Sequence, residues 1–245
     1  MRMGRRLFIV NALLLTSLGM TESSLFAQTN SKSTTPVPRD GGWMKRHDQI
    51  NKRTKEGDID LIFIGDSITQ GWNDNETWKK YYGNRKASNL GISGDRTEHV
   101  LWRLDHGNID GISPKVAVLM IGTNNSGGKE YSAEDIGEGI RAIVAKLRDK
   151  LPNTKVLILA IFPRGEKPNE AREKNAKASK IASEMADDKN VFFLDIGPAY
   201  LNDKGEIDKA IMPDFLHLSP EGYKIWGKSI EPKLSELLGD KPVTE

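Results

Sequence analysis

Leu61-Ile62-Phe63-Ile64-Gly65-Asp66-Ser67-Ile68-Thr69-Gln70 is the stretch that determines the fold class. Four apolar residues lead into a Gly-Asp-Ser turn and then into a segment compatible with a helix. A continuous apolar run closed by glycine is typical of an inner strand of a parallel sheet, and such sheets bind ligands at the carboxyl ends of their strands. The pattern therefore predicts that Ser67 lies at the ligand-binding edge of a sheet. Ser67 as a mere helix N-cap is the alternative interpretation.

Similar apolar runs alternate with segments of helical spacing along the rest of the chain. The runs that predict further strands cover residues 87–94, 115–121, 155–161 and 191–194. Helices are expected around residues 43–50, 78–82, 97–104, 132–151, 169–188 and 220–237. Strands that alternate with helices favour a parallel sheet covered on both faces. The predicted fold class is thus α/β, a three-layer α/β/α sandwich around a five-stranded parallel sheet.

The first 42 residues differ in composition from the rest. Arg2, Arg5 and Arg6 precede an apolar run over residues 7–18, and Ala27 closes the stretch, as expected of a secretory signal peptide. Residues 28–42 are polar and rich in proline, which predicts a flexible linker. We therefore expect a signal peptide over 1–27, a linker over 28–42 and one domain over 43–240. This organisation predicts export to the periplasm or the medium, by the general secretory or the twin-arginine route.

Charge and cysteine content exclude several classes of function. The chain has 36 basic and 34 acidic residues, and removal of residues 1–27 leaves 33 of each. A near-neutral mature chain gives no reason to expect a nucleic-acid partner. The chain has no cysteine, so a thiol nucleophile and a cysteine metal site are excluded. We expect no membrane span after signal cleavage, and the sequence leaves the oligomeric state open, a homodimer included.

The carboxyl ends of three predicted strands and one late loop carry the parts of an acyl-transfer site. Ser67, Gly94 and Asn124 follow successive strands, and a long irregular segment contains Asp214 and His217. A serine nucleophile needs an imidazole base, which a carboxylate holds in the correct tautomer. The three-residue spacing lets Asp214 and His217 share one turn. The backbone N–H groups of Ser67 and Gly94 and the amide of Asn124 are the candidate oxyanion donors.

Four sequence blocks resemble those of the SGNH (GDSL-like) hydrolase superfamily. Within it, the chain is most similar to the catalytic subunits of intracellular platelet-activating-factor acetylhydrolase. The likeness extends from about Leu61 to Trp226. The blocks, in order, are Gly65-Asp66-Ser67, the loop at Gly94, Gly122-Thr123-Asn124 and Asp214-Phe215-Leu216-His217.

The resemblance implies a flavodoxin-like sheet, no cofactor, no metal and a preference for short acyl groups. It also implies the roles of individual residues: Ser67, Asp214 and His217 as the catalytic triad, Ser67, Gly94 and Asn124 as the oxyanion hole, and Ile68 and Leu216 as the walls of a small acyl pocket. The expected function is an exported serine esterase that removes acetyl groups from a small-molecule or glycan ester, most simply an acetylated carbohydrate. Trp72, Trp102 and residues 124–125 suit a sugar. A phospholipid acetylhydrolase or lysophospholipase and a non-catalytic glycan-binding module are the alternatives.

Overall fold

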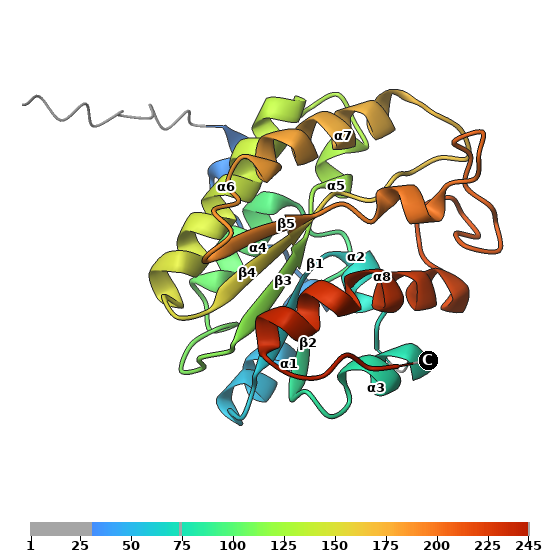
Figure 1. Ribbon diagram of the computed structural model, residues 1–245. Helices are drawn as coiled ribbons and strands as arrows, with labels where there is room; N and C mark the ends of the chain where they lie inside the picture. Colours follow the sequence, from blue (N-terminus) through green and yellow to red (C-terminus); the bar gives the residue numbers. More distant parts are fainter. Residues whose placement is uncertain (1–30, 74, 245) are drawn as a thin grey trace, which may run out of the picture.

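The computed structural model describes residues 31–73 and 75–244 (Figure 1). The signal peptide expected over residues 1–27 lies outside the described residues. Within those ranges, no helix combines the length and the apolar character needed to cross a bilayer.

The core of the fold is a parallel sheet of five strands in the order β2-β1-β3-β4-β5. The strands are β1 (Leu61–Gly65), β2 (Ala87–Gly91), β3 (Val116–Met120), β4 (Lys155–Leu159) and β5 (Val191–Leu194). In this order β2 is added on one side of β1 and β3 on the other, so the strand order reverses at the β1/β3 pair, where doubly wound folds bind their ligands. The predicted α/β/α sandwich with a flavodoxin-like sheet is confirmed.

Helices cover both faces of the sheet (Figure 1). One face packs against α1 (Gly42–Lys55), α4 (Thr97–Leu104), α6 (Ala133–Lys150) and α7 (Glu170–Ser183). The other face packs against α3 (Glu76–Tyr82) and α8 (Pro220–Leu238). Alternate residues of β1 enter the two cores, Ile62 and Ile64 on one side and Leu61 and Phe63 on the other. The short elements are η1 (Lys32–Thr34), α2 (Ser67–Gln70), α5 (Thr123–Ser126) and η2 (Gly197–Tyr200).

The segment over residues 31–41 packs on the domain, which differs from the flexible linker expected over 28–42. Ser33 is fully buried, and its carbonyl oxygen accepts a hydrogen bond from the Thr97 hydroxyl at 2.9 Å. The Val37 N–H donates to the Glu98 carbonyl oxygen at 3.3 Å. The polar composition is typical of a solvated chain, but these contacts with α4 satisfy backbone groups of the segment, and no local sequence pattern predicts such contacts.

Candidate active site

Ser67 lies directly after β1, at the first turn of α2. The side chain of Asp66 accepts a hydrogen bond from the Ile68 N–H at 3.0 Å and so caps this helix. The interpretation of Ser67 as the N-cap is therefore wrong, because Asp66 occupies that position and leaves the Ser67 hydroxyl free. Gly65 and Gly91 let α2 approach the sheet, since a Cβ on Gly65 would lie 2.1 Å from the Thr69 hydroxyl and one on Gly91 would lie 2.3 Å from a backbone nitrogen of α2.

Asp214 and His217 share one tight turn between η2 and α8. One carboxylate oxygen of Asp214 accepts hydrogen bonds from the backbone N–H groups of Leu216 and His217, at 3.1 and 2.7 Å. Phe215 has a left-handed conformation with φ of 58°, which is uncommon for a residue with a side chain. Its carbonyl oxygen accepts a hydrogen bond from the Gly165 N–H at 2.8 Å, so the turn is anchored to the loop after β4.

The structure brings Ser67, His217 and Asp214 together in a hydrogen-bonded chain. The Asp214 carboxylate lies 2.7 Å from Nδ1 of His217, and Nε2 of the same ring lies 3.0 Å from the Ser67 hydroxyl. Because Nδ1 faces a carboxylate it carries the proton, and Nε2 is left to accept one from the hydroxyl. Partial burial raises the pKa of Asp214, but the hydrogen bonds from His217 and Leu216 outweigh it, and the pKa lies below its usual value. Asp214 therefore remains a carboxylate at neutral pH.

Gly94 lies in the loop after β2 and Asn124 in the short helix α5 after β3; these two strands flank β1. Gly94 has a φ of 76°, a conformation that glycine adopts without strain. The Asn124 side chain donates one N–H to the carbonyl oxygen of Asp95 at 2.9 Å, so the two loops are joined. An amide nitrogen has two N–H groups, and the second remains to donate to a ligand.

A fully buried ion pair, which the sequence did not reveal, holds these loops in place. Arg103 donates from Nε to the Asp95 carboxylate at 2.7 Å and from Nη2 to the Gly65 carbonyl oxygen at 3.0 Å. The other carboxylate oxygen of Asp95 accepts from the Trp43 indole at 2.6 Å. Arg103 and Asp95 are both 0% exposed, so removal of one partner would leave an uncompensated charge in the interior. The pair thus connects the end of β1 to the Gly94 loop and, through the Asp95 carbonyl, to Asn124.

The residues expected to contact the substrate occupy different environments. Ile68 is buried in the apolar cluster of the α8 face, and Leu216 is half-buried against the same cluster. Trp72, expected to suit a sugar, is fully buried, because it packs against Tyr223 and Trp226 with ring centroids 4.5 and 5.2 Å away.

Two further expected sugar contacts also have packing roles. Trp102 stacks on His106 with ring centroids 3.7 Å apart. Asn125 is buried and bonds Thr97 and Glu98. Trp72 and Asn125 are therefore not available to a ligand.

Asp66 is a buried carboxyl beside the candidate nucleophile. It is 0% exposed, and its Oδ2 has no hydrogen-bond partner among the residues that the structure describes. Burial raises the pKa of Asp66 to about 7; the Ile68 N–H opposes this rise, the charge of Asp95 adds to it, and His217 opposes it. The folded protein therefore binds a proton at Asp66 that the unfolded chain releases near pH 4.

We expect Asp66→Asn to stabilise the protein at pH 8 and to have little effect at pH 4. Between those values the folded state binds more protons at Asp66 than the unfolded state does, so the free energy of unfolding of the wild type falls as pH rises and levels off above about 7. The asparagine carries no charge and keeps the oxygen that caps Ile68. The difference in Tm between variant and wild type should grow to on the order of 10 °C. Thermal denaturation across this range measures it, and a difference independent of pH would contradict the assignment.

Residues 63–225 match the model of the GDSL-like Lipase/Acylhydrolase family. Among curated proteins, the chain is similar to platelet-activating factor acetylhydrolase IB subunit alpha2 of Rattus norvegicus, with 38% identity over 84% of this chain and 89% of the relative. Subunit alpha1 of the same enzyme from Homo sapiens is 37% identical over 82% of this chain and 87% of its own length.

Solved structures share the fold. A GDSL-like lipase from Bacteroides thetaiotaomicron superposes with a TM-score of 0.59 at 20% identity, covering 78% of this chain and 97% of its own. An acetylxylan esterase from Geobacillus stearothermophilus gives a TM-score of 0.58 at 19% identity, over 77% of this chain and 98% of its own. At these identities the two likenesses concern the fold alone.

Proposed function

Since the chain belongs to the GDSL-like lipase/acylhydrolase family and is a carboxylic ester hydrolase, we propose that it is an exported serine esterase that removes acetyl groups from carbohydrates. The observation that carries the serine mechanism is the hydrogen-bonded chain from Ser67 through His217 to Asp214. A binding module without turnover would have no use for this arrangement, so the alternative of a non-catalytic protein is dropped.

In the proposed first step, the Ser67 hydroxyl oxygen attacks the ester carbonyl carbon while Nε2 of His217 takes the hydroxyl proton. The imidazolium that forms is stabilised by the Asp214 carboxylate, which stays ionised because its pKa is low. The negative charge that develops on the carbonyl oxygen is held by the backbone N–H groups of Ser67 and Gly94 and by the Asn124 amide. Collapse of this intermediate breaks the bond to the alcohol, which leaves with the proton from His217.

The second step hydrolyses the acyl-enzyme. His217, neutral again, takes a proton from water, and the resulting hydroxide attacks the acyl carbonyl carbon. The same three donors stabilise the second oxyanion. When the intermediate collapses, the Ser67 oxygen regains its proton from His217 and the free carboxylic acid is released.

Two ester classes compete as the substrate. The expected signal peptide over residues 1–27 supports an extracellular ester, and acetylated carbohydrate is the class we propose. An acetylated phospholipid is the second candidate, since the chain shares 38% identity with a platelet-activating factor acetylhydrolase subunit. To distinguish the two classes, the rates at which the purified protein hydrolyses acetylated oligosaccharides and an acetyl phospholipid are compared. N-terminal sequencing of the secreted protein tests cleavage after Ala27.

We expect activity on p-nitrophenyl esters to fall steeply from acetate to octanoate. Ile68 is buried in the apolar cluster of the α8 face and Leu216 packs against it, so as walls of the proposed acyl pocket they would leave little room for a longer chain. Because each extra methylene in a pocket of fixed size changes kcat/KM by about tenfold or more, butyrate should already be a poor substrate. Leu216→Ala should extend the accepted chain length. A wild type that prefers octanoate would contradict the acyl pocket.

A further inference from the structure

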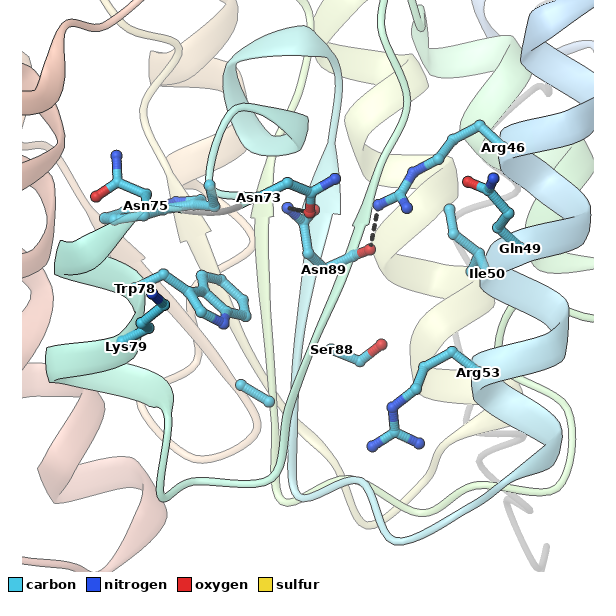
Figure 2. Close-up of a pocket in the computed structure, with 12 residues that line it drawn as sticks. Arg46, Gln49, Ile50, Arg53, Asn73, Asn75, Trp78, Lys79, Ser88 and Asn89 are labelled. Carbon is cyan, nitrogen blue, oxygen red and sulfur yellow. Dashed lines mark hydrogen bonds between the residues drawn. The ribbon is translucent and has the colours of Figure 1, made fainter.

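A polar cavity lies beside the candidate active site, at the outer edge of the sheet between α1 and α3. Its volume is about 460 Å³. Figure 2 shows Arg46 and Arg53 of α1 on one side, Trp78 of α3 on the other, and Ser88 and Asn89 of the edge strand β2 between them. None of these residues belongs to the triad or the oxyanion loops.

The cavity is connected to the candidate nucleophile through α2. The Asn89 side chain, which lines it, donates to the carbonyl oxygens of Thr69 and Gln70 at 2.9 and 3.3 Å. These two residues end the helix that Ser67 begins, and three helical residues span only about 4.5 Å. The cavity therefore adjoins the C-terminal end of the short helix whose first residue is Ser67.

The cavity concentrates positive charge that the mature chain as a whole lacks. Arg46 and Arg53 line it, and none of the described residues that line it is acidic; Lys79 also lines it but is paired with Glu76 at 2.7 Å. Arg46 donates to the carbonyl oxygens of Asn89 and Gly91, at 2.9 and 3.2 Å, and has no carboxylate of the described residues within 4.0 Å. Arg53 donates to the carbonyl oxygens of Gly57 and Asp58, at 2.7 and 3.5 Å, and its Nη1 forms a long ion pair with Glu56 at 4.0 Å. Burial and the charge of Arg103 lower the pKa of Arg46, as expected for a guanidinium without a counter-ion.

The remaining lining groups suit a saccharide. The half-buried ring of Trp78 offers an aromatic face, and amide or hydroxyl groups come from the side chains of Gln49, Asn73, Asn75, Ser88 and Asn89. Sites for small polar ligands combine apolar or aromatic walls with a few placed polar groups. A guanidinium binds a carboxylate in a bidentate geometry that a neutral sugar cannot use.

We infer that this cavity is a subsite for a carboxylate-bearing sugar of an acetylated acidic oligosaccharide whose ester group lies at Ser67. The inference rests on the proposed function and specifies its substrate as an acidic glycan. Arg46 and Arg53 are the specificity-determining residues, and Trp78 provides the face on which the sugar ring packs. Arg39 continues the positive charge toward the site, since it donates from Nη1 to the Ser93 carbonyl oxygen at 2.9 Å, next to Gly94.

The test compares an acetylated oligogalacturonate with an acetylated xylo-oligosaccharide as substrates. We expect wild-type kcat/KM to be at least tenfold higher on the acidic substrate, and 0.5 M NaCl to reduce this ratio. Arg46→Gln/Arg53→Gln should reduce the ratio at least tenfold, chiefly through a higher KM on the acidic substrate. Arg141→Gln, at a partly exposed position on α6, removes one positive charge away from the cavity and should leave the ratio unchanged. A ratio near one in the wild type, or one that the folded double variant preserves, would overturn the inference.

A binding measurement separates this inference from the proposed function. Calorimetry with oligogalacturonate that carries no acetyl group reports on the cavity alone, whether or not any ester is hydrolysed. We expect saturable binding that weakens at least tenfold in Arg53→Gln, a variant that keeps the edge-strand hydrogen bonds of Arg46 and so remains folded if the double variant does not. Vesicles of phosphatidylglycerol are the second probe. Arginine-dependent binding to the vesicles without binding to the oligosaccharide would identify a lipid phosphate as the anion and would also overturn the inference.

Discussion

Ser67→Ala should lower kcat for p-nitrophenyl acetate on the order of 10⁶-fold and leave the fold intact. The variant removes the atom that forms the bond to the acyl group, so His217 and Asp214 retain their geometry with nothing to activate. The hydroxyl makes one hydrogen bond, to Nε2 of His217, and Asp66 rather than Ser67 caps α2. We therefore expect the Tm to stay within about 1 °C of the wild type. Steady-state kinetics and thermal denaturation on the same preparation measure both quantities.

A second readout identifies the nucleophile directly. A sulfonyl fluoride should add one mass increment to the wild type and none to Ser67→Ala. Ser183→Ala is a matched control, because the Ser183 hydroxyl donates to the Lys180 carbonyl oxygen on α7, and loss of this hydrogen bond should change neither labelling nor turnover. Substantial turnover in folded Ser67→Ala would mean that water activated by His217 attacks the ester, and the serine mechanism would be wrong.

The strands could be predicted because their signal is local. Residues 61–64, 116–120 and 191–194 are continuous apolar runs. Because helices cover both faces of the sheet, its strands do not have to alternate apolar and polar residues. Helix starts are harder to predict from the sequence where the N-cap residue is not one that is usually favoured there. Arg96 is the N-cap of α4 although Asp95 precedes it, because Asp95 faces inward and pairs with Arg103. A tertiary contact of this kind overrides the local preference for aspartate at a helix start.

The candidate triad could be predicted from the types and the order of its residues, whereas the buried residues that hold its loops in place could not. Ser67 and His217 are 150 residues apart, yet the sheet edge and a resemblance to known motifs were enough to place them together. No sequence motif predicts the contacts among Asp95, Arg103 and Trp43, because each of these residues alone is typical of a surface or packing position. Trp72 illustrates the opposite error. This tryptophan was expected to contact a sugar, but five aromatic neighbours bury it: Phe63, Trp78, Tyr82, Tyr223 and Trp226.

Asn124→Ala should lower kcat by about 10²-fold to 10³-fold, with a smaller change in KM. The amide would donate to the oxyanion, whose charge develops mainly in the transition state, so its loss affects turnover more than substrate binding. The variant also loses the hydrogen bond from Asn124 to the Asp95 carbonyl oxygen, which costs about 1 kcal/mol of stability. Measurement of Tm and kcat on the same preparations separates the two effects. Fully active but destabilised Asn124→Ala would show that the residue only joins the loops.

The neighbouring amide provides the contrast. Asn125 is buried, accepts a hydrogen bond from the Thr97 N–H at 3.2 Å and donates one to Glu98 at 3.1 Å. Asn125→Ala should therefore lower the Tm more than Asn124→Ala does, while the folded fraction keeps its turnover.

Asn124→Asp tests the sign of the interaction. A carboxylate has no N–H to donate, and its charge would face both the Asp95 carbonyl oxygen and the developing oxyanion. The aspartate variant should therefore be less active than the alanine variant, although it is closer in size to the native residue. Equal activity of the two variants would exclude electrostatic stabilisation at this position.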